Sequence, residues 1–262
     1  MPPLITLTTD FGMRDPYVAA MKGVLASRCP GAAVVDLSHD IAPHDVLGGA
    51  LFLAASLPYF PSGTVHVAVV DPGVGSDRPE IAARWQEQYL VMPDNGLATL
   101  LWRECPPDAV HTITTASPPG SEVSPTFHGR DIFAPAAAAL ASGTPLEGLG
   151  PAAAAPVELH FPHPRFEGTR VHGAVVHIDH FGNATTNIPR SLLPAGAVRV
   201  SAAGRDIGPV RRTYADVSPG EPLALIGSSG YLEIAVNQVS AAAQLGLERG
   251  TEVTVARADS PG

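Results

Sequence analysis

The first half of the chain alternates strand-like and helix-like segments, and this order restricts the possible fold more than any other feature. Short apolar runs at residues 4–8, 33–37 and 65–70 predict buried strands. Apolar side chains at helical spacing over residues 17–25 predict a first helix, and the almost wholly apolar residues 44–57 predict a second, buried one. A β-α-β-α-β order predicts a mostly parallel sheet with helices on both faces.

The remaining elements of this half are shorter. Asp15 is the expected N-cap of the first helix, with Pro16 at its first helical position. Further along, residues 81–84 and 89–92 predict a hairpin. Two more helices are expected, one from about Leu97 and an alanine-rich one over residues 131–141.

A proline-rich segment at residues 143–164 separates this half from a different pattern. We interpret it as an extended linker and predict a domain boundary near residue 160, giving domains 1–160 and 161–262. One short helix is expected at about residues 240–247. The predicted strands of the second domain are residues 173–178, 197–200, 223–226, 231–236 and 252–256. This domain is therefore expected to be a small β sandwich or barrel.

Charge and apolar content restrict the class of protein. The chain has 25 acidic and 16 basic residues and a formal net charge of -9, which argues against non-specific binding of nucleic acid or anionic lipid. Its longest apolar stretch, residues 46–60, is too short to cross a bilayer, and no signal peptide is apparent. Cys29 and Cys105 are far apart in the sequence and are expected to be reduced thiols. We therefore expect a cytoplasmic protein without a membrane or nucleic-acid partner.

Several well-known catalytic motifs are missing from the sequence. It contains no G-x-x-x-x-G-K-[ST] phosphate loop, no G-x-S-x-G and no H-E-x-x-H, and no G-x-G-x-x-G follows the first strand. The common nucleotide-binding, serine-hydrolase and zinc-protease sites are therefore not indicated.

Acidic loops follow each of the first three predicted strands. Asp10 lies in the first loop (residues 9–12), whereas Asp36 and Asp71 begin the second (36–40) and the third (71–78). Because ligands of open α/β sheets bind beyond the carboxyl ends of the strands, these loops together predict a site for a polar ligand. For each loop taken alone, turn and cap chemistry explains the same residues equally well.

Further polar blocks occur later in the chain, and their order suggests a family. They are Pro93–Gly96, Thr126–Asp131, Ile178–Asn183 and Gly227–Gln238. Together with Thr8–Gly12, Asp15–Val18, Met21–Gly23 and Asp71–Gly75, the sequence resembles the S-adenosylmethionine (SAM) hydrolases, also called SAM hydroxide adenosyltransferases. These enzymes are relatives of the fluorinases and chlorinases. The resemblance extends over nearly the whole chain.

The resemblance has consequences for fold, assembly and reaction. It implies an N-terminal doubly wound α/β domain and a C-terminal small β-barrel. It also implies a homotrimer, with each active site between the first domain of one subunit and the second domain of its neighbour. The implied reaction is attack of water or hydroxide on ribose C5′ of SAM, giving adenosine and L-methionine. No cofactor or metal is implied, because a neutral thioether leaves from a sulfonium without acid assistance.

The implied catalytic residues are Asp71, Arg78 and His128. Arg78 would keep Asp71 ionised, and Asp71 and His128 would hold the water in line with C5′. Either of these two residues could take the proton of the water, and the sequence does not decide between them. Taken without the resemblance, the Asp71–Arg78 pair would be read as a salt bridge within a loop.

The implied substrate-binding residues are Asp10, His44, Phe127, Asp179, Phe181, Asn183, Ser228, Val236 and Gln238. Asp10 would accept hydrogen bonds from the two ribose hydroxyls, Asp179 would pair with the methionine ammonium, and Ser228 would bind the carboxylate.

The remaining residues of that set would surround adenosine or mark departures from the halogenases. Phe127 and Phe181 would pack on the nucleoside, and Asn183 and Gln238 would reach the adenine edge. His44 stands where the halogenases carry tryptophan, and Ser229 and Val236 replace fluorinase arginines. These departures put halogenase-like contacts at those positions in doubt.

Four readings of the function remain open at this point. Hydrolysis is favoured, because the triad is retained and the short Pro79–Glu80 link lacks the long fluorinase insertion. Adenosyl transfer to a halide and a non-catalytic sensor of SAM or adenosine are alternatives. A metal-dependent hydrolase using the run of His39, Asp40, His44 and Asp45, completed by Asp10, Asp71 and His180, is a weaker one, because residues five apart do not share a helix face.

Overall fold

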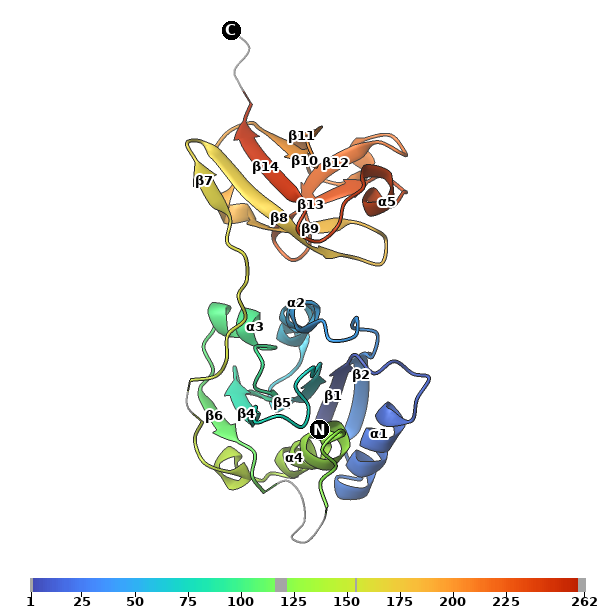
Figure 1. The fold of residues 1–262 in the computed structure, drawn as a ribbon, viewed down its shortest axis with the longest axis vertical. Helices are drawn as coiled ribbons and strands as arrows, with labels where there is room; N and C mark the ends of the chain where they lie inside the picture. Colours follow the sequence, from blue (N-terminus) through green and yellow to red (C-terminus); the bar gives the residue numbers. More distant parts are fainter. Residues whose placement is uncertain (1, 116–121, 154, 259–262) are drawn as a thin grey trace. The chain divides into compact units, whose positions relative to one another are not determined.

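The computed structural model describes residues 2–115, 122–153 and 155–258. The chain divides into two compact units, residues 1–160 and 161–262 (Figure 1). Separate hydrophobic clusters form the cores of the two units.

A six-stranded mixed sheet organises the first unit. In spatial order its strands are β2 (Ala33–Ser38), β1 (Leu4–Thr9), β3 (Val65–Val69), β5 (Gln88–Pro93), β4 (Glu80–Trp85) and β6 (Ala109–Thr112). The first four pair in parallel, whereas β4 and β6 join antiparallel at one edge. The prediction of an α/β unit with a mostly parallel sheet is therefore confirmed.

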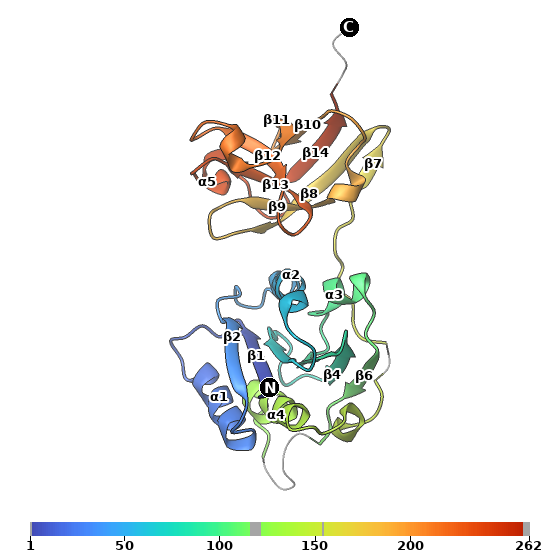
Figure 2. The ribbon, with the colours of Figure 1, turned by 180° about the vertical axis from the view of Figure 1, so that it is seen from behind.

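Helices cover both faces of this sheet, as the alternating pattern predicted. On one face α1 (Tyr17–Arg28) and α4 (Ala134–Ala141) pack against Ile5, Val67 and Val91. On the other, α2 (Val46–Ser56) and α3 (Thr99–Glu104) pack against Val70 and neighbouring side chains of β4 and β5. Figures 1 and 2 show the sheet between these two helix layers. The 3₁₀ turns are η1 (Leu57–Tyr59) and η3 (Leu146–Leu149).

Three local details differ from the sequence-based expectations. Pro16, and not Asp15, is the N-cap of α1, without a side-chain cap bond. Helix α2 is buried on one face only, through residues such as Ala50 and Leu53, so its all-round apolar character does not mean complete burial within the chain. The fourth helix begins with a π-helical segment, η2 (Gly129–Phe133), before α4.

The second unit is a closed seven-stranded barrel with one added strand. Its order is β14 (Glu252–Arg257), β10 (Val198–Ala202), β11 (Arg205–Arg211), β12 (Pro222–Ile226), β13 (Tyr231–Val236), β9 (Ala184–Pro189), β8 (Arg170–Ile178) and β7 (Arg165–Glu167). Pairing of β14 with β8 closes the ring. The predicted barrel is thus confirmed, and the sandwich alternative is wrong. The unit also contains η4 (Arg190–Leu192), η5 (Tyr214–Asp216) and α5 (Ala241–Leu245).

In the described part of the chain, no helix has the length and apolar character that crossing a bilayer requires.

Candidate active site

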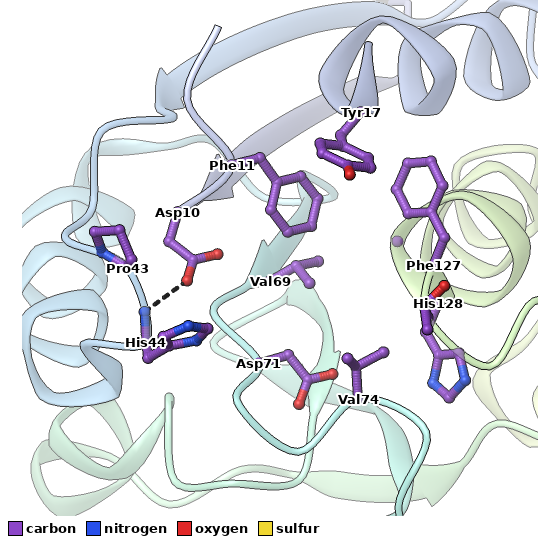
Figure 3. Close-up of a pocket in the computed structure, with 12 residues that line it drawn as sticks. Asp10, Phe11, Tyr17, Pro43, His44, Val69, Asp71, Val74, Phe127 and His128 are labelled. Carbon is purple, nitrogen blue, oxygen red and sulfur yellow. Dashed lines mark hydrogen bonds between the residues drawn. The ribbon is translucent and has the colours of Figure 1, made fainter. Parts of the chain in front are cut away.

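A pocket of about 280 Å³ opens beyond the carboxyl ends of β1 and β3 in the first unit. It brings together five of the sequence-predicted residues, which are Asp10, His44, Asp71, Phe127 and His128. Figure 3 shows three aromatic rings on one side of this pocket and His44 and Asp71 on the opposite side. Its position agrees with the rule that α/β sheets bind ligands at this edge.

Asp10 is held at the end of β1 by its neighbours. Its Oδ2 accepts a hydrogen bond from the backbone N–H of His44 at 2.8 Å (Figure 3). His44 has a positive φ of 66°, an unusual conformation for a residue other than glycine, which turns its N–H toward Asp10. No described residue donates a hydrogen bond to the other oxygen, Oδ1. Asp10 thus retains an acceptor for a ligand hydroxyl.

The guanidinium of Arg78 connects the other two predicted catalytic residues. Its Nε donates to Asp71 Oδ1 at 2.8 Å, and its Nη2 donates to Asp71 Oδ2. The same Nη2 lies 3.1 Å from Nδ1 of His128. Sequence positions 71, 78 and 128 therefore meet in one network, as the family resemblance implied they would.

Glu80, which the sequence analysis did not select, is a fourth member of this network. Its Oε1 lies 2.9 Å from His128 Nδ1 and 3.3 Å from Arg78 Nη1. Only 4% of the Asp71 side chain is exposed, 10% of Arg78 and His128, and 18% of Glu80. Charge-assisted hydrogen bonds in such a place are stronger than those between neutral groups. The network is a largely buried, charged support for the pocket floor.

An aromatic cluster lines the pocket on the side away from Asp71. The ring centroids of Phe11 and Tyr17 are 5.8 Å apart, and Phe127 lies 6.2 Å and 5.2 Å from them. Phe127 was predicted as a ligand contact, whereas Phe11 and Tyr17 were not. Both belong to motifs noted in the sequence, Thr8–Gly12 and Asp15–Val18. Their closeness in the sequence to Asp10 could have indicated that they line the same pocket.

Asp36 does not line the pocket, contrary to expectation, although Pro43 and His44 of the connection after β2 do. Asp36 instead pairs with the single lysine of the chain, Lys22, at 2.5 Å, and with His39 at 3.1 Å. Partial burial opposes ionisation of Asp36, but the hydrogen bonds from Lys22 and His39 hold its pKa below the usual value. His39 also bonds Thr9 through Nδ1 at 2.8 Å. Asp36 and His39 therefore support the end of β1 and do not line the pocket.

Several residues of the metal site considered in the sequence have other partners. Asp45 caps α2 by accepting from the Gly48 N–H at 2.9 Å, and His39 is bound as described. Among the residues that the structure describes, no group of three or more histidine, cysteine, aspartate or glutamate side chains is arranged to hold a metal ion.

The barrel unit has a second pocket, of about 770 Å³. Its lining includes all six of the substrate-binding residues predicted there, Asp179, Phe181, Asn183, Ser228, Val236 and Gln238. Asp179 organises the β8–β9 loop because its Oδ1 accepts from the N–H groups of Phe181 at 2.9 Å and Asn183 at 2.8 Å. The Phe181 side chain is 76% exposed, so its ring is available to a ligand.

Tyr214 and Glu233 are lining residues of this pocket that sequence reasoning missed. The Tyr214 hydroxyl donates to Glu233 Oε1 at 2.7 Å. Burial raises the pKa of Glu233 despite this bond, and the charge of Asp179 adds to the rise. The sequence feature that could have indicated Glu233 is a glutamate within the otherwise apolar strand Tyr231–Val236. Asn237, which also lines this pocket, donates from its side-chain amide to the Val217 carbonyl at 2.8 Å.

Known proteins similar to this chain were found by sequence and by structure. The chain is 47% identical to an (R)-S-adenosyl-L-methionine hydrolase of Thermus thermophilus, over 94% of this chain and 96% of that protein. It is 30% identical to a fluorinase of an Actinoplanes species, over 98% of each. A crystal structure of an uncharacterized conserved protein from Thermotoga maritima matches with a TM-score of 0.89 and 35% identity, over 97% of this chain and 100% of that one.

Family models agree with these relatives. The model for the SAM hydroxide adenosyltransferase N-terminal domain matches residues 5–150, and the model for the C-terminal domain of the same family matches residues 173–254. These two ranges contain every residue that lines the two pockets. The chain therefore belongs to the SAM hydroxide adenosyltransferase family.

Proposed function

We propose that this protein hydrolyses SAM to adenosine and L-methionine through attack of water or hydroxide on ribose C5′. The observation that carries the proposal is the Asp71–Arg78–His128 network beside a pocket that also presents Asp10. Near full-length similarity to proteins named (R)-S-adenosyl-L-methionine hydrolase supports the same reaction.

The reaction requires mainly that the enzyme align the water with C5′ and exclude other water. Methionine leaves the sulfonium as a neutral thioether, so that no group has to protonate it. Water is a weak nucleophile, and it gains most from being held in line with C5′ in a site that excludes other water. In the proposed mechanism Asp71 and His128 hold this water, and Arg78 keeps Asp71 ionised.

Substrate contacts are proposed for both pockets. In the first, Asp10 accepts hydrogen bonds from the ribose hydroxyls, His44 lies beside the substrate, and Phe127 packs on the nucleoside. In the second, Asp179 pairs with the methionine ammonium and Ser228 donates to the carboxylate. Adenosine contacts are completed by Phe181, Asn183, Val236 and Gln238.

The proposed assembly is a homotrimer in which each active site lies between two subunits. Its support is the division of the binding residues between two units: the water-holding network belongs to the first, whereas the residues proposed for methionine belong to the second. One substrate molecule needs both sets, and a cyclic oligomer can supply them from neighbouring copies.

We propose the cytoplasm as its compartment. Cys29 and Cys105 are both free thiols, as is typical of proteins in reducing compartments.

The test of this function is product analysis after incubation with SAM, with and without a chelator. Equal amounts of adenosine and methionine, unchanged by chelator and lost in Asp71→Ala and His128→Ala, are the expected result. SAM that binds without conversion would identify a sensor instead. A 5′-chlorinated nucleoside formed only with chloride would identify a halide transferase, and turnover abolished by chelator would identify a metal enzyme.

A further inference from the structure

Charges of both signs line the barrel pocket without pairing with each other. Asp179 and Glu233 are its acidic lining residues, and Arg212 is the one basic side chain among the described residues that line it. The Arg212 guanidinium has no ion pair or hydrogen bond with any residue in the described part of the chain. A cation and a carboxylate that share a pocket but stay apart can each bind an opposite charge of one ligand.

The backbone around Arg212 is held in place by its own loop and by β13. The Arg212 N–H donates to Asp216 Oδ2 at 2.9 Å, and the Thr213 N–H donates to the same oxygen at 3.2 Å. Thr213 and Asp216 also form a capping box at the start of η5. The hydroxyl of Tyr214 connects this loop to β13 by donating to Glu233 at 2.7 Å. The backbone at Arg212 is therefore fixed, while its guanidinium remains available.

The end of this loop is attached to the strands that carry Ser228, the residue proposed for the methionine carboxylate. Val217 packs against the small hydrophobic cluster of β12 and β13, and its carbonyl accepts from the Asn237 side-chain amide at 2.8 Å. The turn that connects these two strands contains Ser228, which lines the same pocket as Arg212. Arg212 and Ser228 therefore reach one pocket from two segments whose backbones are held together.

A carboxylate bound by Ser228 would have no other cation near it on these strands. Residues 217–239, which include β12, β13 and their turn, contain neither lysine nor arginine. A serine hydroxyl is neutral and donates a single hydrogen bond. A guanidinium adds a full positive charge and parallel N–H donors whose spacing matches the two oxygens of a carboxylate. Arg212 is thus the lining residue suited to complete the site for this group.

We propose that Arg212 binds the carboxylate of the methionine part of SAM, and that with Asp179 it makes the barrel pocket specific for a zwitterionic α-amino-acid group. This proposal rests on the proposed hydrolysis. The carboxylate is not altered when the bond from C5′ to sulfur breaks, so Arg212 holds the same group before and during the reaction. Its effect should therefore be on substrate binding, with little effect on the chemical step.

Decarboxylated SAM tests this contact, because it differs from SAM only by the loss of the carboxylate. We expect the wild type to prefer SAM, as measured by kcat/KM. Arg212→Gln should raise KM for SAM by about tenfold to a hundredfold with kcat within about twofold, as for a lost hydrogen bond to a charged group. Its KM for decarboxylated SAM should stay near the wild-type value. Arg212→Lys, which keeps the charge but not the parallel donors, should give an intermediate preference.

Arg211→Gln is the matched control, because it changes the net charge equally one residue away. Arg211 is the exposed last residue of β11 and is not among the residues that line the pocket. This variant should keep the wild-type KM and the wild-type preference for SAM, and melting temperatures report the folding of all variants. An Arg212→Gln protein with the wild-type preference would overturn the proposal. Equal losses in Arg211→Gln would also overturn it, because they would assign the effect to overall charge.

Binding measurements separate this proposal from the proposed function. Calorimetric titration with SAM and with decarboxylated SAM gives the preference without any turnover. Hydrolysis of SAM with a preference that does not depend on Arg212 would refute this role and leave the function intact. A wild type that binds SAM through Arg212 but does not convert it would refute hydrolysis and support the role in binding. A wild type that binds neither compound would refute both.

Discussion

Arg78 connects the groups at the pocket floor because its guanidinium is a fork with several donors. Nε and Nη2 reach Asp71, and Nη1 reaches Glu80 and the Pro79 carbonyl. The side chain also lies over the Phe133 ring, 5.7 Å from its centroid. A lysine has the same charge but offers a single point of donation, so it cannot make these contacts together.

We therefore expect Arg78→Lys to lower kcat strongly although the charge is preserved. The loss should be about a hundredfold, typical of a displaced proton-transfer group. Product formation from SAM gives kcat, and the melting temperature reports folding. Arg199→Lys serves as the control, because that arginine pairs with Asp206 on the barrel surface and should tolerate the change. Equal kcat in Arg78→Lys and the wild type would show that charge alone suffices.

His66 is a buried histidine whose role is stability and not catalysis. It is 1% exposed in β3, accepts from the Thr6 hydroxyl at Nδ1, and donates from Nε2 to Gln88 at 2.8 Å. Burial lowers the pKa of His66 to about 4 from 6.5, despite the bond to Gln88. The unfolded chain therefore binds a proton at a pH where the folded one does not.

The stability of the fold should consequently fall as the pH is lowered from 6.5 to 4. Above pH 6.5 the contribution of His66 to the free energy of unfolding is complete. This free energy should be about 2 kcal/mol lower at pH 5. Urea unfolding followed by tryptophan fluorescence isolates the first unit, because Trp85 and Trp102 both belong to it. In NMR spectra the His66 ring should remain neutral at pH 5. A His66 ring that titrates near 6.5 contradicts this account.

Single residues were predictable where a motif fixed their place, and less so where a contact depends on strand register. Asp10, Asp71 and His128 do line one pocket. Asp36 follows a strand in the same way but turns to Lys22, because the α1 side chain lies within reach of it. The contact of Glu80 with His128 depends on where β4 begins, a boundary that apolar periodicity does not define.

At the scale of elements, periodicity predicted the α/β unit well and the barrel incompletely. Strands β1, β2 and β3 are apolar and were located within a few residues. By contrast, β9 has the sequence ATTNIP and β11 has RDIGPVR, which are too polar and too rich in turn residues to be recognised. Their strand form depends on pairing with neighbours in a closed barrel, which local sequence does not show.

The loop between β3 and β4 is packed against the segment that precedes His128. Gly75 in this loop has a φ of +78°, and a Cβ there would lie 2.4 Å from the carbonyl oxygen of Pro125. That oxygen belongs to the backbone and cannot move aside without shifting the segment. The loop carrying Asp71 and Arg78 and the segment carrying His128 thus depend on a glycine between them.

We expect Gly75→Ala to destabilise the first unit by about 2 to 3 kcal/mol and to lower kcat as well. Gly63→Ala is a matched control, because Gly63 has a similar φ of +82° with no atom within 4 Å of the added Cβ. It should cost about 1 kcal/mol, from backbone strain alone, and should keep kcat. Urea unfolding and product analysis measure both effects. Equal losses in the two variants would show that the Pro125 contact is unimportant.

At the scale of the whole molecule, the proposed active site needs residues from both units of the chain. Asp71 belongs to the α/β unit and Asp179 to the barrel. Two sequence changes that each abolish activity should therefore complement each other if the site forms between subunits, and should not if it forms within one chain. Asp71→Asn and Asp179→Asn are suitable, because both preserve side-chain size.

The two variants are co-expressed with different tags and purified through both tags, so that only mixed particles remain. In a trimer whose sites each join the first unit of one subunit to the second unit of the next, any mixed particle has one intact site in three. Doubly purified protein should therefore show about one third of wild-type activity, although each parent is nearly inactive. Light scattering should give the mass of three chains. Mixed particles no more active than their parents would place the whole site within one chain, and a monomer would exclude a shared site.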